Sequence, residues 1–265
     1  MVLVRLVAVV VVAACGSQPA GPPQNVTSGA GAYVAVAPDQ PLGRIGIAPL
    51  RAPDAGDWLP AGAQAVLVPL PAEGLAPGAA LSAIDSAGRT ARVTAGAPAK
   101  VPYGCDGNQL DVLPFTGGEL APGPVWLLPP GAPAAWSPRA LAIASPGAAT
   151  EAQRRYTVGP LSLELARTDR ARGTLAIVRG GRALHQIAIE RGEMEGAEPT
   201  PLDIRSSGVA IPEPVGAWSL AEEGPFLLIL RVPSYEGVNV TAILVEDAGA
   251  RELPELAIYL YRCAF

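Results

Sequence analysis

Residues 174–189, with the sequence TLAIVRGGRALHQIAI, decide the predicted fold of this chain. Two runs rich in aliphatic residues, 174–178 and 183–189, flank a short connection that contains Gly180-Gly181. Glycine reaches the positive φ values that a two-residue hairpin turn requires. The stretch therefore predicts two antiparallel strands joined by a tight turn.

Similar segments recur on both sides of this hairpin, separated by turns rich in Gly, Pro and Asp. Asp85-Ser86-Ala87-Gly88 predicts a second hairpin, and the run FLLILRV at 226–232, apolar except for Arg231, predicts a strand buried on both faces. The stretch 248–257 is a candidate for a short helix, which Pro254 interrupts, and 147–154 is a candidate for a helical turn or a linker. The predicted strands cover 33–37, 44–48, 65–70, 80–84, 90–94, 109–113, 125–128, 140–144, 156–165, 174–178, 183–189, 226–232, 238–245 and 256–263.

Short strands at this spacing predict an all-β protein, built from sandwich or barrel-like β domains with few or no helices. The composition agrees with a folded chain, because 49% of the residues are hydrophobic although Gly and Pro number 30 and 29. The formal net charge is −5 and charged residues make up 16% of the chain. A basic surface for a phosphate backbone is therefore not expected, and we expect no nucleic-acid partner.

The N-terminus carries a different pattern. Arg5 precedes nine consecutive apolar residues, 6–14, and Cys15 follows at once. A run of nine is too short to cross a bilayer, which needs about 20 helical residues. It has the length of the apolar core of a secretory signal peptide.

The tetrapeptide Val12-Ala13-Ala14-Cys15 resembles the lipobox of bacterial lipoproteins. The resemblance implies cleavage before Cys15, fatty acyl chains such as palmitate on that cysteine, and a protein anchored to a membrane of the cell envelope. Gly16, where members retained in the inner membrane tend to have aspartate, implies the outer membrane rather than the inner one. The alternatives are a cleaved signal peptide without lipid and an uncleaved anchor.

These segments give the predicted domain organisation. Residues 1–14 form the signal peptide, and 15–32 form the lipidated cysteine with a flexible tether rich in Gly, Pro and small residues. An N-terminal β domain at 33–146 and a C-terminal β domain at 155–265 follow, divided by the polar stretch 147–154. A disulfide between Cys105 and Cys263 would tie the two together or make them one unit.

The two remaining cysteines, Cys105 and Cys263, are an even number in an oxidising compartment, so we expect them to form that disulfide. The alternative is two buried free thiols. Near Cys105, the side chains of Asp106, Asn108 and Asp111 are candidates for a calcium site, although the spacing of an EF-hand is missing. A tight turn beside the disulfide explains the same residues, and we expect no cofactor.

The string Tyr103-Gly104-Cys105-Asp106-Gly107 also resembles the opening of the periplasmic lipoprotein inhibitors of C-type lysozyme. In that family a compact β-barrel closes its cysteine pair within itself. In this chain the partner cysteine, Cys263, is far along the sequence, which departs from the pattern. The resemblance implies an inhibitor of a periplasmic enzyme.

Catalytic residues are few. His185 is the only imidazole and lies on a strand face predicted to be apolar, together with Ala183, Ile187 and Ile189, so a structural role is expected. A cluster of carboxylates is predicted to be a solvated loop: Glu190, Glu193, Glu195, Glu198 and Asp203. We therefore expect an envelope lipoprotein with a binding or structural role and no enzymatic activity. The alternatives are a hydrolase that uses paired carboxylates, Asp106 with Asp111 or Glu193 with Glu195, and the periplasmic inhibitor.

Overall fold

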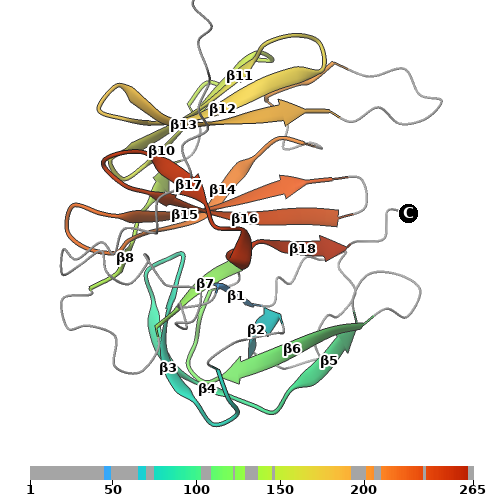
Figure 1. Cartoon of the computed structure of the whole chain (residues 1–265), viewed down its shortest axis with the longest axis vertical. Coiled ribbons are helices and arrows are strands. Elements are labelled where there is room, and N and C mark those ends of the chain that lie inside the picture. Colours follow the sequence, from blue (N-terminus) through green and yellow to red (C-terminus); the bar gives the residue numbers. More distant parts are fainter. Residues whose placement is uncertain are drawn as a thin grey trace, which may run out of the picture.

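The computed structural model describes residues 45–48, 65–69, 75–102, 109–121, 123–128, 137–144, 147–191, 201–205, 210–234 and 237–261. These residues form antiparallel strands in three sheets, with one short 3-10 turn and no α-helix among them. Figure 1 shows the three sheets one above another. The predicted all-β fold is thereby confirmed.

The first sheet, which we call the barrel, holds the N-terminal strands. Their order is β2-β1-β7-β3-β4-β6-β5, and β2 also pairs with β6, so the sheet closes on itself. The strands are β1 (Ile45–Ala48), β2 (Ala65–Pro69), β3 (Ala80–Asp85), β4 (Thr90–Ala95), β5 (Ala99–Pro102), β6 (Gln109–Thr116) and β7 (Gly123–Leu128). A separate apolar cluster belongs to the barrel: Leu81, Ala83, Val93, Ala95, Leu113, Phe115, Val125 and Leu127.

The outer sheet and the middle sheet form a sandwich. The outer sheet has the order β13-β12-β11-β10-β9 and the middle sheet β17-β16-β15-β14-β8, with β18 paired to β16. The outer strands are β9 (Ile143–Ala144), β10 (Gln153–Val158), β11 (Leu161–Arg167), β12 (Arg172–Arg179) and β13 (Arg182–Glu190). The middle strands are β8 (Arg139–Ala140), β14 (Glu213–Ser219), β15 (Phe226–Pro233), β16 (Gly237–Val245), β17 (Ala250–Glu252) and β18 (Ile258–Tyr261).

The middle sheet is covered on both faces, which confirms the prediction made from its apolar run. In β15, the side chains of Phe226 and Leu228 pack into the core shared with the outer sheet. Those of Leu227 and Ile229 pack into a second core with Ile84 and other residues of the barrel. Because successive side chains of a strand point to opposite faces, a strand between two layers needs an apolar residue at every position.

Both predicted hairpins are present. Gly180 and Gly181 have φ values of 57° and 82° and form the two-residue turn between β12 and β13. In the turn between β3 and β4, the fully buried carboxylate of Asp85 accepts hydrogen bonds from the backbone N–H groups of Ala87 at 2.9 Å and Arg89 at 2.8 Å. The same carboxylate accepts one from the N–H of Ala121 at 2.6 Å, which ties the turn to the segment before β7.

Some predicted elements were wrong. The stretch 156–165 forms two strands, because Gly159 takes a positive φ of 54° and starts a turn between β10 and β11. The helix considered at 248–257 is instead β17 and a 3-10 turn at Pro254–Leu256. Proline lacks the N–H that a longer helix would need, so the helical conformation ends after one turn.

The predicted strand at 33–37 lies outside the described residues, as do the leader 1–14 and the tether 15–32. Strands β8 and β9 precede the predicted division at 147–154, yet they pair with β14 and β10. The division of the chain into two domains stays a prediction.

Candidate functional site

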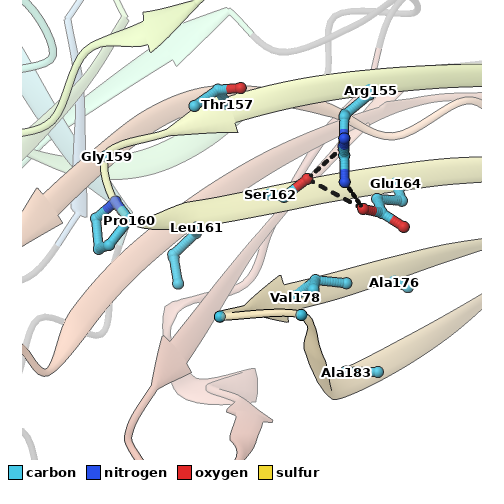
Figure 2. A pocket seen from close by; sticks show the side chains of 12 residues that line it. Arg155, Thr157, Gly159, Pro160, Leu161, Ser162, Glu164, Ala176, Val178 and Ala183 are labelled. Atoms are coloured by element: carbon cyan, nitrogen blue, oxygen red, sulfur yellow. Dashed lines mark hydrogen bonds and ion pairs between the residues drawn. The ribbon is translucent and has the colours of Figure 1, made fainter.

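A hollow of about 660 Å³ lies on the solvent face of the outer sheet, where the hairpins β10–β11 and β12–β13 turn (Figure 2). It is open to solvent, since its floor is the exposed face of a sheet. Its lining comes from four neighbouring strands and their turns: Arg155, Thr157, Gly159, Pro160, Leu161, Ser162, Glu164, Ala176, Val178, Gly180, Gly181 and Ala183.

The alternation of β11 explains why this face is polar. Leu161, Leu163 and Leu165 are at most 2% exposed and pack into the sandwich core. Ser162 and Glu164 lie between them in the sequence and therefore point to the opposite, solvent face.

The register places small side chains side by side across the floor. Thr157 is opposite Ser162, Ser162 is opposite Val178, and Val178 is opposite Ala183. In the next row, Glu164 is opposite Ala176. Short side chains leave the face hollow, while Arg155 and Glu164 stand higher beside it (Figure 2).

A bulge in β13 brings Ala183 onto this floor. Ile177 is opposite His185, but Val178 is opposite Ala183, so Leu184 is an extra residue in β13. Because of the extra residue, Ala183 and His185 point to opposite faces of the sheet although they are two positions apart. The prediction that Ala183 shares a face with His185 was therefore wrong, because strict alternation does not hold through a bulge.

A hydrogen-bonded group of three side chains forms the polar wall of the hollow. The Arg155 guanidinium donates from Nε to Ser162 Oγ at 2.8 Å and from Nη2 to Glu164 Oε1. The Ser162 hydroxyl donates to the same Glu164 oxygen at 3.3 Å. All three side chains come from directly opposed positions or neighbours on β10 and β11, so the strand pairing fixes their arrangement.

The sequence did not single out Arg155, Ser162 or Glu164. A usable signal was present, because polar residues alternate with buried ones on both sides of Gly159-Pro160. Recognising it requires the turn at Gly159, which was missed when 156–165 was predicted as one strand.

Most of the predicted site residues lie outside the described residues. These are Cys15, Cys105, Cys263, Asp106, Asn108, Glu193, Glu195 and Glu198. Asp111 is described: it is exposed on β6, and its Oδ1 lies 3.2 Å from Lys100 Nζ on the neighbouring strand. Within the described part of the chain, no group of three or more His, Cys, Asp or Glu side chains is placed to hold a metal ion.

Glu190 and Asp203 take part in surface ion pairs. Glu190 Oε1 lies 3.3 Å from Arg172 Nε, and Asp203 Oδ2 lies 3.0 Å from Arg205 Nη2. Hydrogen bonds from the Arg205 side chain and backbone lower the pKa of Asp203. His185 Nε2 lies 3.8 Å from Glu252 Oε1 of β17, so this imidazole lies at the contact between the outer and middle sheets.

A second polar group lies inside the sandwich, away from the hollow. The Arg154 guanidinium carbon sits 4.8 Å from the centre of the Tyr156 ring, and Arg154 Nη1 lies 3.7 Å from Glu213 Oε1. Burial raises the pKa of Tyr156 to about 12, with the Arg154 charge opposing the rise and the Glu213 charge adding to it. These residues lie between the sheets and do not line the hollow.

Comparisons of the chain with protein-family models, with curated proteins and with solved structures give no match. A search of the described residues for a helix of sufficient length and apolar character to cross a bilayer finds none.

Proposed function

We propose that this protein is a lipid-anchored binding protein of the cell envelope that presents the hollow on its outer sheet to a partner. The single observation that carries the proposal is the hollow itself: a concave face with a floor of small side chains and one fixed polar group. Its volume falls within the range of about 300–1,000 Å³ that is usual for ligand sites.

The polar group of the hollow favours binding over nucleophilic catalysis. A nucleophilic serine needs a base that removes its proton. Here the Ser162 hydroxyl donates to Glu164 Oε1 at 3.3 Å, but that carboxylate oxygen already accepts a hydrogen bond from Arg155 Nη2. Ser162 Oγ also accepts a hydrogen bond from Arg155 Nε, which makes the oxygen a weaker nucleophile. The one histidine of the chain points to the opposite face of the outer sheet, where it meets Glu252.

The anchor is proposed from the lipobox-like Val12-Ala13-Ala14-Cys15. Two or three acyl chains, at about 0.8 kcal/mol per buried methylene, would hold the protein on a membrane durably. Gly16 favours the outer membrane. Cells fed an alkyne-tagged palmitate should label the wild-type protein and the Cys105→Ser variant, but not Cys15→Ser. A wild-type protein without label would contradict the anchor.

The binding role is tested by photo-crosslinking in intact cells. We expect p-benzoylphenylalanine in place of Ala176, on the floor of the hollow, to give one discrete adduct. The matched control is the same replacement at Ala188, which is exposed on the solvent face of β13 but does not line the hollow. Equal crosslinking at both positions, or none at either, would contradict a binding role for the hollow.

A further inference from the structure

We propose that the hollow receives an extended, uncharged peptide segment of its partner, whose backbone carbonyl and N–H bind Arg155 and Glu164. This inference rests on the proposed binding function and names the chemistry of the ligand. It follows from the charge of the wall, its unused hydrogen-bonding atoms and the character of the floor.

The charges of the hollow disfavour an ionic ligand. Among the described residues that line the hollow, only Arg155 and Glu164 are charged, and they form an ion pair with each other. An anionic ligand would meet the Glu164 carboxylate beside the guanidinium, and a cationic ligand would meet the guanidinium beside the carboxylate. A ligand that satisfies both groups at once is neutral and carries both a donor and an acceptor.

The same pair leaves one nitrogen, Arg155 Nη1, and one oxygen, Glu164 Oε2, unused for such a ligand. Arg155 uses Nε and Nη2 within the wall, and Glu164 uses Oε1. Among the described residues, Arg155 Nη1 and Glu164 Oε2 have no partner, and both side chains are at least 40% exposed. An extended peptide presents the C=O and N–H of one residue on the same edge, which supplies both complementary groups together.

The floor favours a peptide over a sugar or a nucleobase. Sugars and bases are commonly held by stacking on aromatic rings, and none of the lining residues that the structure describes is aromatic. Thr157, Ala176, Val178 and Ala183 instead present methyl groups across the face. Small side chains of an extended peptide can pack on such a floor while its backbone reaches the wall.

The test uses the full chain purified in detergent and a fluorescein-labelled, end-blocked peptide of alternating serine and alanine. Fluorescence polarisation should show saturable binding. Methylating the central backbone nitrogen of the peptide removes its N–H and should weaken binding about tenfold, as expected for the loss of one hydrogen bond to a charged group. Replacing the central alanine by lysine or by glutamate should also weaken it.

Variants of the protein locate the binding. Arg155→Ala and Glu164→Ala should each weaken binding of the neutral peptide about tenfold. Val178→Asp should abolish it, because it places an unpaired charge on the uncharged floor. The matched controls are Arg172→Ala, which removes a comparable exposed ion pair of the same sheet, and Gln186→Ala, on the same face beyond Ala176. Both should bind like the wild type, and unfolding curves should show that every variant is folded.

The ligand chemistry would be overturned if the neutral peptide does not bind, if its N-methylated form binds equally well, or if Arg172→Ala weakens binding as much as Arg155→Ala. The outcomes for the proposed function are separate. An adduct from position 176 to a lipid or a polysaccharide would retain a binding role and exclude a peptide ligand.

Discussion

The indole rings of Trp126 and Trp218 pack against each other where the barrel meets the middle sheet. Their centroids are 6.4 Å apart with planes inclined by 35°, and both residues are completely buried. Trp126 belongs to β7 of the barrel, and Trp218 belongs to β14 of the middle sheet. This pair lies in the core that also contains Ile84 and Leu227, so residues distant in the sequence exclude water together.

Trp218→Ala should destabilise the protein by about 3–5 kcal/mol, since it removes a large buried ring and leaves a cavity that the sheets cannot close. We expect urea unfolding, followed by circular dichroism, to remain a single transition at a lower midpoint. Two separate unfolding transitions, one of which stays at the wild-type midpoint, would contradict the shared core. Gln186→Ala, on the exposed face, is the control.

Gly216 gives the Trp218 ring its space. A Cβ added at Gly216 would lie 2.8 Å from Cη2 of that ring, which is closer than real Cβ atoms come, and 3.1 Å from Cζ3, which is tighter than most Cβ contacts. Gly216→Ala should therefore cost about 1–3 kcal/mol through overpacking. Gly147→Ala is the matched control, because nothing lies within 4 Å of its added Cβ. Equal melting temperatures for the two variants would refute this account.

Asp85→Asn should destabilise the protein by about 2–4 kcal/mol at neutral pH, because the buried carboxylate loses its charge while its donors remain. Burial raises the pKa of Asp85, but hydrogen bonds from Ala121 and Arg89 outweigh this effect and lower it overall. The wild type should therefore lose stability as the pH falls below about 4, where the unfolded carboxyl gains a proton first. The Asn variant should show a shallower acid loss in unfolding measured across pH; a parallel loss would argue against a role for Asp85.

Tyr156→Phe should leave stability unchanged or raise it by up to about 1 kcal/mol at pH 7, because the buried hydroxyl has no hydrogen-bond partner in the described structure. At high pH the stabilities of the wild type and of Tyr156→Phe should differ. The pKa of Tyr156 is raised to about 12, so the folded state keeps this proton after an unfolded tyrosine, with a pKa of about 10, has lost it.

The hydroxyl of Tyr156 therefore contributes to a loss of stability as the pH rises above about 10. Phe at this position should flatten that loss, and the ultraviolet titration of tyrosinate should lose its last step near pH 12. Tyr259→Phe is the control, because Tyr259 is 42% exposed. If both variants flatten the alkaline loss equally, burial of Tyr156 is not the cause.

The all-β fold could be predicted because its signals are local. Gly180-Gly181 forms its turn whatever the distant parts of the chain do. The apolar run of β15 predicts a buried strand without knowledge of which residues bury it. Strand β14, Glu213–Ser219, was not predicted because Pro212 and Pro214 are typical of turns. Pro214 is accommodated beside a bulge, where the register shifts between Pro214 and Gly216.

The hollow could not be predicted for a different reason. Ser162 and Val178 are neighbours only through the pairing of β11 with β12, and Ala183 reaches the same floor only through the bulge at Leu184. The alternation of polar and apolar residues along each strand does not reveal which residues of neighbouring strands lie opposite each other. The polar wall has the same origin, since Arg155 and Glu164 meet across β10 and β11.

The position of β15 between two layers has a consequence for how this protein can diverge over evolution. Each side chain from Phe226 to Leu230 is buried in the core on the face to which it points. Substitutions there are therefore limited to exchanges among apolar residues of similar volume. In β11 every second side chain points to solvent, so it is free of this packing restriction. In an alignment of orthologues, the central strand should therefore read as an uninterrupted block of aliphatic and aromatic letters, whereas the peripheral strand should alternate between invariant and freely varying columns.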